Sequence, residues 1–187
     1  MRVDGRPMRT LWPAPERDAV QVIDQRALPH RLLVERLDSV AAVHTAIRDM
    51  WVRGAPLIGA TAAYGLALQA RADAGDAGLR GAADRLAAAR PTAVNLAWAL
   101  QRMLGRLLAL PPAERAEAAW DEAGAVAEDD VRANAAIGRH GLALLRELAA
   151  RRPGRTLNLL THCNAGWLAT VDWGTATAPI YQARADG

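Results

Sequence analysis

A long central stretch of the sequence has the periodicity of amphipathic helices, which limits the folds that the chain can adopt. From Ser39 to about Arg152, apolar residues recur at the spacing of an amphipathic helix, and prolines and glycines divide the stretch into segments. Ser39 is a suitable N-cap for the first segment. Pro56 sits where proline is tolerated, in the first turn of a helix that runs toward Arg71. The pattern predicts a domain built mainly of helices.

Two further helices are expected in the same stretch. Thr92 is a suitable N-cap for one of them, which ends at Pro111-Pro112. A long helix follows and ends at Pro153-Gly154. One face of the long helix is apolar and carries Ile137, Leu144, Leu145 and Leu148. Two tryptophans at apolar helical positions, Trp51 and Trp98, are expected in the core.

The segments on either side of the helical stretch read as β-structure. In residues 1–37, four prolines interrupt the chain and Ala19–Ile23 alternates between apolar and polar side chains, which predicts a short hairpin or meander. After Gly154, residues 156–161 read as a strand, 162–166 as a turn and 174–178 as the approach to a helix. Strand, turn and helix make the first half of a βαβ unit, so we expect a truncated second domain there.

The charge of the chain does not indicate nucleic-acid binding. The net charge is +3 and the pI is about 9.9, but all 23 basic residues are arginine, which never loses its proton and so keeps the pI high. The arginines alternate with acids, as in Asp129, Asp130 and Arg132, a pattern typical of solvated helix faces. The absence of lysine and phenylalanine points to the codon usage of a GC-rich genome.

The number of cysteines and the hydropathy of the sequence indicate in which cellular compartment to expect the protein. Cys163 is the only cysteine, so no disulfide forms within the chain. No run approaches about 18 apolar residues, and the amino terminus has no apolar signal region. We therefore expect a cytoplasmic protein without a membrane segment.

Two short motifs place arginine just before a helix. They are Arg53-Gly54-Ala55-Pro56 and Arg90-Pro91-Thr92. The first turn of a helix presents unpaired N–H groups and a partial positive charge, and arginine adds a charge-assisted clamp for an anion. Two such helix starts that converge would suit a phosphate monoester. The alternative for each arginine is a packed stem with a bond to a helix carbonyl.

The third motif, Thr161–Gly166, places the single thiol after the predicted strand. In open α/β folds, ligands bind at the carboxyl ends of strands, and a thiol near helix N–H groups is reactive. The alternative for Cys163 is a small buried hydrophobic side chain. His162 is a candidate base or a hydrogen-bonded structural group. The other histidines have no metal-ligand spacing to one another or to Cys163, so no metal site is predicted.

Three segments, in this order and with compatible spacing, resemble the methylthioribose-1-phosphate isomerase family: Val52–Gly59, Arg90–Leu100 and Leu160–Gly166. The opening Leu11-Trp12 and Ile23–Pro29 also fit the start of that family. The resemblance runs across essentially the whole chain and covers about the first half of the usual length of the family. It implies an α+β protein. A β-meander and a helical domain (1–152) would be followed by the truncated start of a Rossmann-like α/β domain (153–187).

The resemblance also implies an activity and a site. The family is an aldose–ketose isomerase that converts 5-methylthioribose 1-phosphate to 5-methylthioribulose 1-phosphate in methionine salvage, without a metal or organic cofactor. It implies phosphate contacts at Arg53, Gly54, Ala55 and Arg90, a catalytic role for Cys163, and a homodimer of the full-length protein. The acid/base aspartate of the family would follow the last residue of this sequence, so we expect no turnover by these 187 residues alone.

Two other functions stay open within the wider superfamily. One is a non-catalytic regulatory subunit of a translation-initiation exchange factor, which would bind a sugar phosphate or a nucleotide. The other is ribose-1,5-bisphosphate isomerase. The combination of Arg53, Arg90 and Cys163 favours an enzyme over a regulatory subunit.

Overall fold

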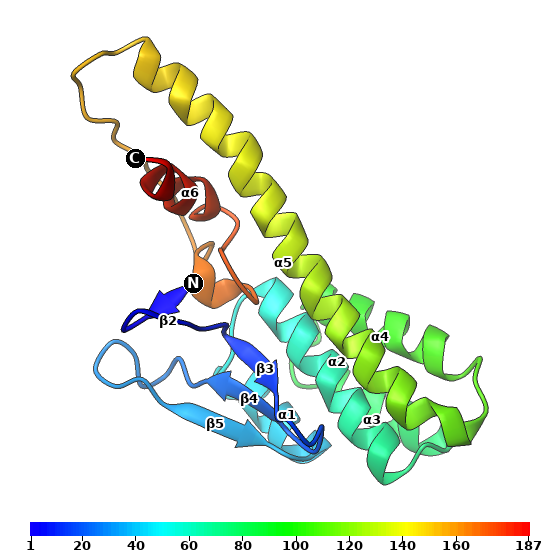
Figure 1. The fold of residues 1–187 in the computed structure, drawn as a ribbon. Helices are drawn as coiled ribbons and strands as arrows, with labels where there is room; N and C mark the ends of the chain where they lie inside the picture. The colour runs from blue at the N-terminus through cyan, green and yellow to red at the C-terminus, as the bar shows by residue number, and fades with distance from the viewer.

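Helix α2 (Ala55–Ala72) lies at the centre of the computed structural model, which describes all residues from 1 to 187. Thirteen of its 18 residues are buried, so other elements must cover it on every side. Small side chains allow close packing: a Cβ added at Gly65 would lie 3.0 Å from a methyl group of Val43. The helices around it are α1 (Val40–Arg48), α3 (Asp76–Ala87), α4 (Val94–Leu107) and α5 (Pro112–Ala150) (Figure 1).

Two small antiparallel sheets precede the helices. Strands β1 (Arg2–Val3) and β2 (Arg6–Pro7) form a two-stranded ribbon. A second sheet contains, in the order β3-β4-β5, the strands Leu11–Pro13, Val20–Ile23 and Val34–Leu37. The alternation in β4 buries Val20 and Val22 and leaves Gln21 partly exposed. The predicted meander is therefore confirmed.

Most helix boundaries follow the local signals in the sequence. Ser39 Oγ accepts a hydrogen bond from Ala42 N at 3.2 Å, so Ser39 is the N-cap of α1 as predicted. Pro56 lies in the first turn of α2, and α5 ends shortly before Pro153. Thr92 was the wrong N-cap for α4, because a turn from Arg90 O to Ala93 N (3.0 Å) makes Ala93 the capping residue.

The second half of α5 projects beyond the other helices and is accompanied by α6 (Ala178–Asp186) (Figure 1). Gln182 Nε2 donates to the carbonyl of Ala135 at 3.1 Å, and Gly138 and Gly141 leave room for the α6 side chains above them. The predicted apolar face is present here but it is not buried: the exposed fractions are 43% for Ile137, 62% for Leu144 and 43% for Leu148.

The predicted strand at residues 156–161 was wrong. These residues form no ladder with any strand of the structure, and Leu160 is fully exposed. A strand needs a neighbour to satisfy its N–H and C=O groups, and both sheets lie in the first 37 residues. Residues 153–187 therefore contain a 3₁₀ turn, η1 (Trp167–Ala169), and α6, but not the strand that would begin a Rossmann-like unit. The division at residue 152 stays a prediction.

Trp98 is 48% exposed, so its predicted place in the core was also wrong. The core side of α4 carries Leu96, Leu100 and Met103, and Trp98 lies on another side of the helix. The guanidinium of Arg102 stacks 5.5 Å from the centre of its ring. None of the helices combines the length and the hydropathy needed to cross a bilayer.

Candidate functional site

The start of α2 has the features of an anion-binding helix terminus. Gly54 is its N-cap, with φ of +106°, and makes no side-chain capping bond. The first helical hydrogen bond runs from Ile58 N to Gly54 O, so the N–H groups of Ala55 and Leu57 have no partner within the helix. A Cβ at Gly54 would overlap the backbone of Ala169 in η1. Glycine is therefore required here by both the dihedral angle and the space.

The start of α4 is also free of a side-chain cap. Its N-cap, Ala93, has no polar side chain, and the preceding Arg90 is partly buried. Arg90 lines a cavity of about 250 Å³ together with Pro91, Ala93 and Leu96. The arginine of the second motif thus lies at a hollow beside the first turn of α4.

The first turns of α2 and α4 are neighbours. A Cβ added at Gly59 would lie 2.9 Å from the carbonyl oxygen of Asn95, so the two backbones meet at this point. A second cavity of about 240 Å³ opens beside the contact. Its lining combines both helix starts with the middle of α5 and consists of Pro56, Gly59, Asn95, Trp98, Val126, Asp129, Asp130 and Ala133. The structure therefore brings the two helix starts to one region, but neither Arg53 nor Arg90 is among the residues that line this shared cavity.

Neither arginine of the two motifs is committed to a carboxylate. Arg53 is exposed and Arg90 is partly buried. The arginines that form ion pairs are others, namely Arg9, Arg17, Arg26, Arg36, Arg48, Arg102, Arg115, Arg132, Arg146 and Arg151. The charges of Arg53 and Arg90 are thus available to a ligand.

Cys163 lies in the loop that precedes η1, and its side chain is exposed. Its φ of +66° is unusual for a residue with a side chain, and its carbonyl accepts from Ala165 N at 3.2 Å. The alternative of a buried hydrophobic cysteine is therefore wrong. Cys163 is a free thiol in the segment that leads into η1, and Ala169 of η1 packs against Gly54 at the start of α2.

Sequence reasoning missed the residues that hold the segment after Cys163. Thr10 Oγ1 donates to Thr170 O at 2.6 Å, and Thr10 N donates to Val171 O. Asp130 Oδ2 accepts from Val171 N at 2.7 Å, and its other oxygen accepts from Asn134. Burial raises the pKa of Asp130. Adjacent helical residues point about 100° apart, which is a signal that Asp130 does not share the solvated face of Asp129.

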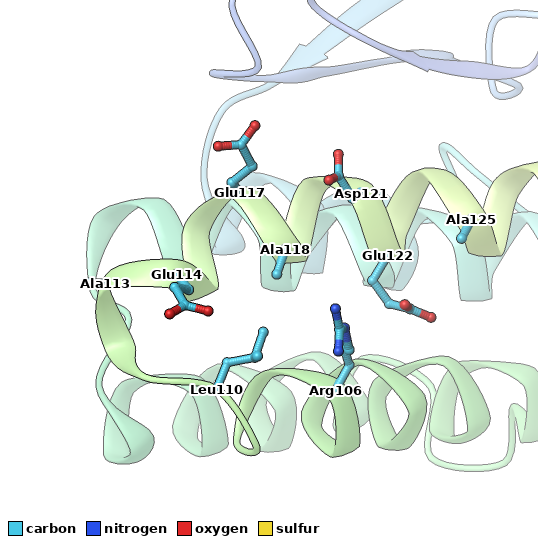
Figure 2. Close-up of a pocket in the computed structure, with 9 residues that line it drawn as sticks. All are labelled: Arg106, Leu110, Ala113, Glu114, Glu117, Ala118, Asp121, Glu122 and Ala125. Atoms are coloured by element: carbon cyan, nitrogen blue, oxygen red, sulfur yellow. The ribbon is translucent and has the colours of Figure 1, made fainter.

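A larger cavity, of about 630 Å³, lies elsewhere, between the end of α4 and the start of α5. Figure 2 shows acidic side chains along this part of α5, with Arg106 of α4 facing them. This cavity contains no residue of the three motifs, so the size of a cavity alone does not identify the site. No group of three or more His, Cys, Asp or Glu side chains lies close enough together to hold a metal ion.

Sequence comparison assigns the chain to a family. Residues 51–187 match the Initiation factor 2 subunit family. The chain is 59% identical over 187 residues to the methylthioribose-1-phosphate isomerase of Methylobacterium nodulans, covering 100% of this chain and 51% of that protein. It is 55% identical over 192 residues to the protein of the same name from Rhodospirillum rubrum, covering 100% of this chain and 49% of that protein. The chain thus spans about half the length of these curated relatives.

Two solved structures share the fold. The 5-methylthioribose 1-phosphate isomerase of Pyrococcus horikoshii has a TM-score of 0.84 at 37% identity, covering 97% of this chain and 51% of that chain. Subunit delta of the translation initiation factor eIF-2B from A. fulgidus has a TM-score of 0.83 at 40% identity, covering 97% of this chain and 52% of that chain. Because the family match extends from residue 51 to residue 187, the chain belongs to the Initiation factor 2 subunit family.

Proposed function

We propose that this chain is the sugar-phosphate-binding half of a methylthioribose-1-phosphate isomerase. The observation that carries the proposal is its similarity, over the whole chain, to proteins of that name at 53–59% identity. The reaction is the conversion of 5-methylthioribose 1-phosphate to 5-methylthioribulose 1-phosphate, a step of methionine salvage. A cytoplasmic location and a homodimer of the full-length protein belong to the same proposal.

Phosphate binding is the role that the helix starts support. The free N–H groups of Ala55 and Leu57 and the dipole of α2 favour an anion, and Arg53 stands directly before Gly54. Arg90 adds a second positive charge at the start of α4, the neighbouring helix. A phosphate held by both starts would fix the sugar and orient its reacting carbons, an effective-concentration contribution that can reach several kcal/mol.

The substrate explains why an acid/base group is needed as well. Phosphate on the anomeric oxygen prevents simple ring opening to a free aldehyde, so the enzyme has to act on a locked sugar. One hydrogen moves between carbon 1 and carbon 2, as a proton through an enediol-like species or as a hydride. Either route requires a positioned acid/base group and exclusion of water. In our proposal, Cys163 carries a proton or stabilises the developing charge, and an aspartate outside these 187 residues is its partner.

A regulatory subunit of the exchange-factor type is the second candidate. The observation in its favour is the fold shared with the initiation factor subunit from A. fulgidus, at 40% identity. The curated relatives named as isomerases are more similar, at 53–59% identity. The two candidates differ in one measurable property, because only the isomerase converts the sugar phosphate.

The test has a binding arm and a turnover arm. Isothermal titration should detect binding of 5-methylthioribose 1-phosphate to the chain itself, and Arg53→Ala should weaken that binding about tenfold or more because a charge-assisted contact is lost. Arg85→Ala, at an exposed position of α3, is the control. Fusion of the chain to the unmatched half of the M. nodulans relative should give conversion detectable by NMR. Equal affinity of Arg53→Ala and the unaltered chain, or a folded fusion without conversion, would contradict the proposal.

A further inference from the structure

Gln25 makes hydrogen bonds to two segments that are far apart in sequence. It lies two residues after the end of β4 and is partly buried. Its backbone N–H donates to the carbonyl of Trp51 at 2.9 Å, and its side-chain Nε2 donates to the carbonyl of Leu168 at 2.6 Å. One residue thus ties the loop before α2 to the 3₁₀ turn η1.

The two bonded segments are the two sides of the Gly54 contact. Trp51 lies three residues before Gly54, and Leu168 directly precedes Ala169, whose backbone occupies the space where a Cβ of Gly54 would be. A change in the distance between these segments would therefore open or close the contact at the N-cap of α2. The reach of the Gln25 side chain helps to set that distance.

The neighbours of Gln25 fix its position. Asp24 is 3% exposed and accepts from Arg26 Nη2 at 2.7 Å, and this hydrogen bond lowers the pKa of Asp24. The guanidinium of Arg26 lies 4.4 Å from the centre of the Trp51 ring. The ion pair between Asp24 and Arg26 and the stacking of Arg26 on Trp51 fix the residues on either side of Gln25 in the sequence. These contacts help to orient the Gln25 side chain.

We propose that Gln25 is a positioning residue: it sets the separation between η1 and the first turn of α2, and so the geometry of the sugar-phosphate site. The proposal rests on the proposed function only in placing the phosphate at the start of α2. Gln25 acts through the backbones of Trp51 and Leu168 and does not itself touch the ligand. Its effect is therefore on the shape of the site, through a neutral donor to the Leu168 carbonyl.

Two variants separate this role from simple packing. Gln25→Leu removes the donor, and Gln25→Glu keeps the shape but places a carboxylate against the Leu168 carbonyl. Both should speed amide hydrogen exchange in residues 166–170 about tenfold while leaving α2 and α4 unchanged, as expected for loss of one hydrogen bond. Both should weaken binding of 5-methylthioribose 1-phosphate by a similar factor. Gln101→Leu, at an exposed position of α4, is the control and should change neither quantity.

The pH dependence gives a readout that a packing role would not move. When the carboxyl group introduced by Gln25→Glu takes up a proton, its O–H can donate to Leu168 as the amide does. The affinity of Gln25→Glu relative to the unaltered chain should therefore recover as the pH falls toward the carboxyl pKa, about 4.3 or higher, while that of Gln25→Leu should not.

The outcomes distinguish this inference from the proposed function. Faster exchange confined to residues 166–170, with the pH-dependent recovery, supports the positioning role. Unchanged exchange in that segment, or equally faster exchange throughout the chain, overturns it. If the unaltered chain binds no sugar phosphate, the proposed function fails, and hydrogen exchange alone decides whether Gln25 holds η1 against α2.

Discussion

Among single residues, Gly54 shows how the fold and the proposed site both depend on the absence of a Cβ atom at one position. Its positive φ and its contact with the Ala169 backbone each exclude a side chain. The absence of a side chain here lets η1 approach the first turn of α2. The requirement for glycine is thus structural first, and the proposed phosphate site uses the helix start that this glycine forms.

Gly54→Ala should lower the free energy of unfolding by about 1–3 kcal/mol, because the added methyl group meets the Ala169 backbone and the dihedral angle is unfavourable. Urea titration followed by circular dichroism measures this. Gly81→Ala is the control: Gly81 lies in α3 with open space around its Cα, so the substitution should stabilise the chain by about 0.5–1 kcal/mol. An unchanged free energy of unfolding in Gly54→Ala would contradict this prediction and would show that η1 can move away from the added methyl group without destabilising the chain.

Cys163→Ala should leave the melting temperature nearly unchanged, since the thiol is exposed and packs into no core. In the fusion with the second half of a relative, the same change should lower turnover by about 10²-fold or more, as expected for loss of an acid/base group. Iodoacetamide should modify the single thiol of the folded chain, and sugar phosphate should slow the modification in the fusion. Near-normal turnover of Cys163→Ala would remove the cysteine from the mechanism.

Among the elements, α5 is joined to the loop after η1 by the partly buried carboxylate of Asp130. Burial raises the pKa of Asp130 above the ordinary value of 3.8. The folded chain therefore holds the Asp130 proton more tightly than the unfolded chain does. The favourable contribution of this proton is complete below about pH 3.8 and is lost as the pH rises through the folded pKa.

Asp130→Asn removes this titration. We expect the free energy of unfolding of the unaltered chain, minus that of the variant, to fall as the pH rises through this window and to be flat above it. Urea titrations from about pH 3 to pH 7 measure the difference. Asp84→Asn, on the exposed side of α3, should not show the same fall. A difference that increases with pH would mean that the Val171 N–H bond outweighs burial.

The elements that the sequence predicts well are those fixed by neighbouring residues. Ser39 caps α1 and Pro56 opens α2 because each acts within one turn of its own helix. The strand at residues 156–161 depends on a partner, and no strand of these 187 residues lies beside it. For the site, the motifs predicted the two helix starts, but Gln25 and Asp130 act through tertiary bonds that no local pattern reveals.

At the scale of the whole molecule, burial is concentrated around α2 and declines toward the far end of α5. The amides of α2 should therefore exchange only on global unfolding, whereas those of residues 140–150 should exchange through local opening. Native-state hydrogen exchange with mass spectrometry distinguishes the two regions. Equal protection of α2 and the end of α5 would contradict the view that the helices around α2 form the stable unit.

Helix α5 is packed into the helical domain at one end only, like a beam that is fixed at one end. Its 39 residues extend about 58 Å. One end packs against α2 and α4, and the other end packs against α6. The portion beyond Gly138 is about 18 Å long, so a tilt of about 10° at Gly138 displaces the tip by about 3 Å. Asp130 and Asn134 lie close to that point. A tilt of α5 at this point would therefore displace α6 farther than the atoms beside η1.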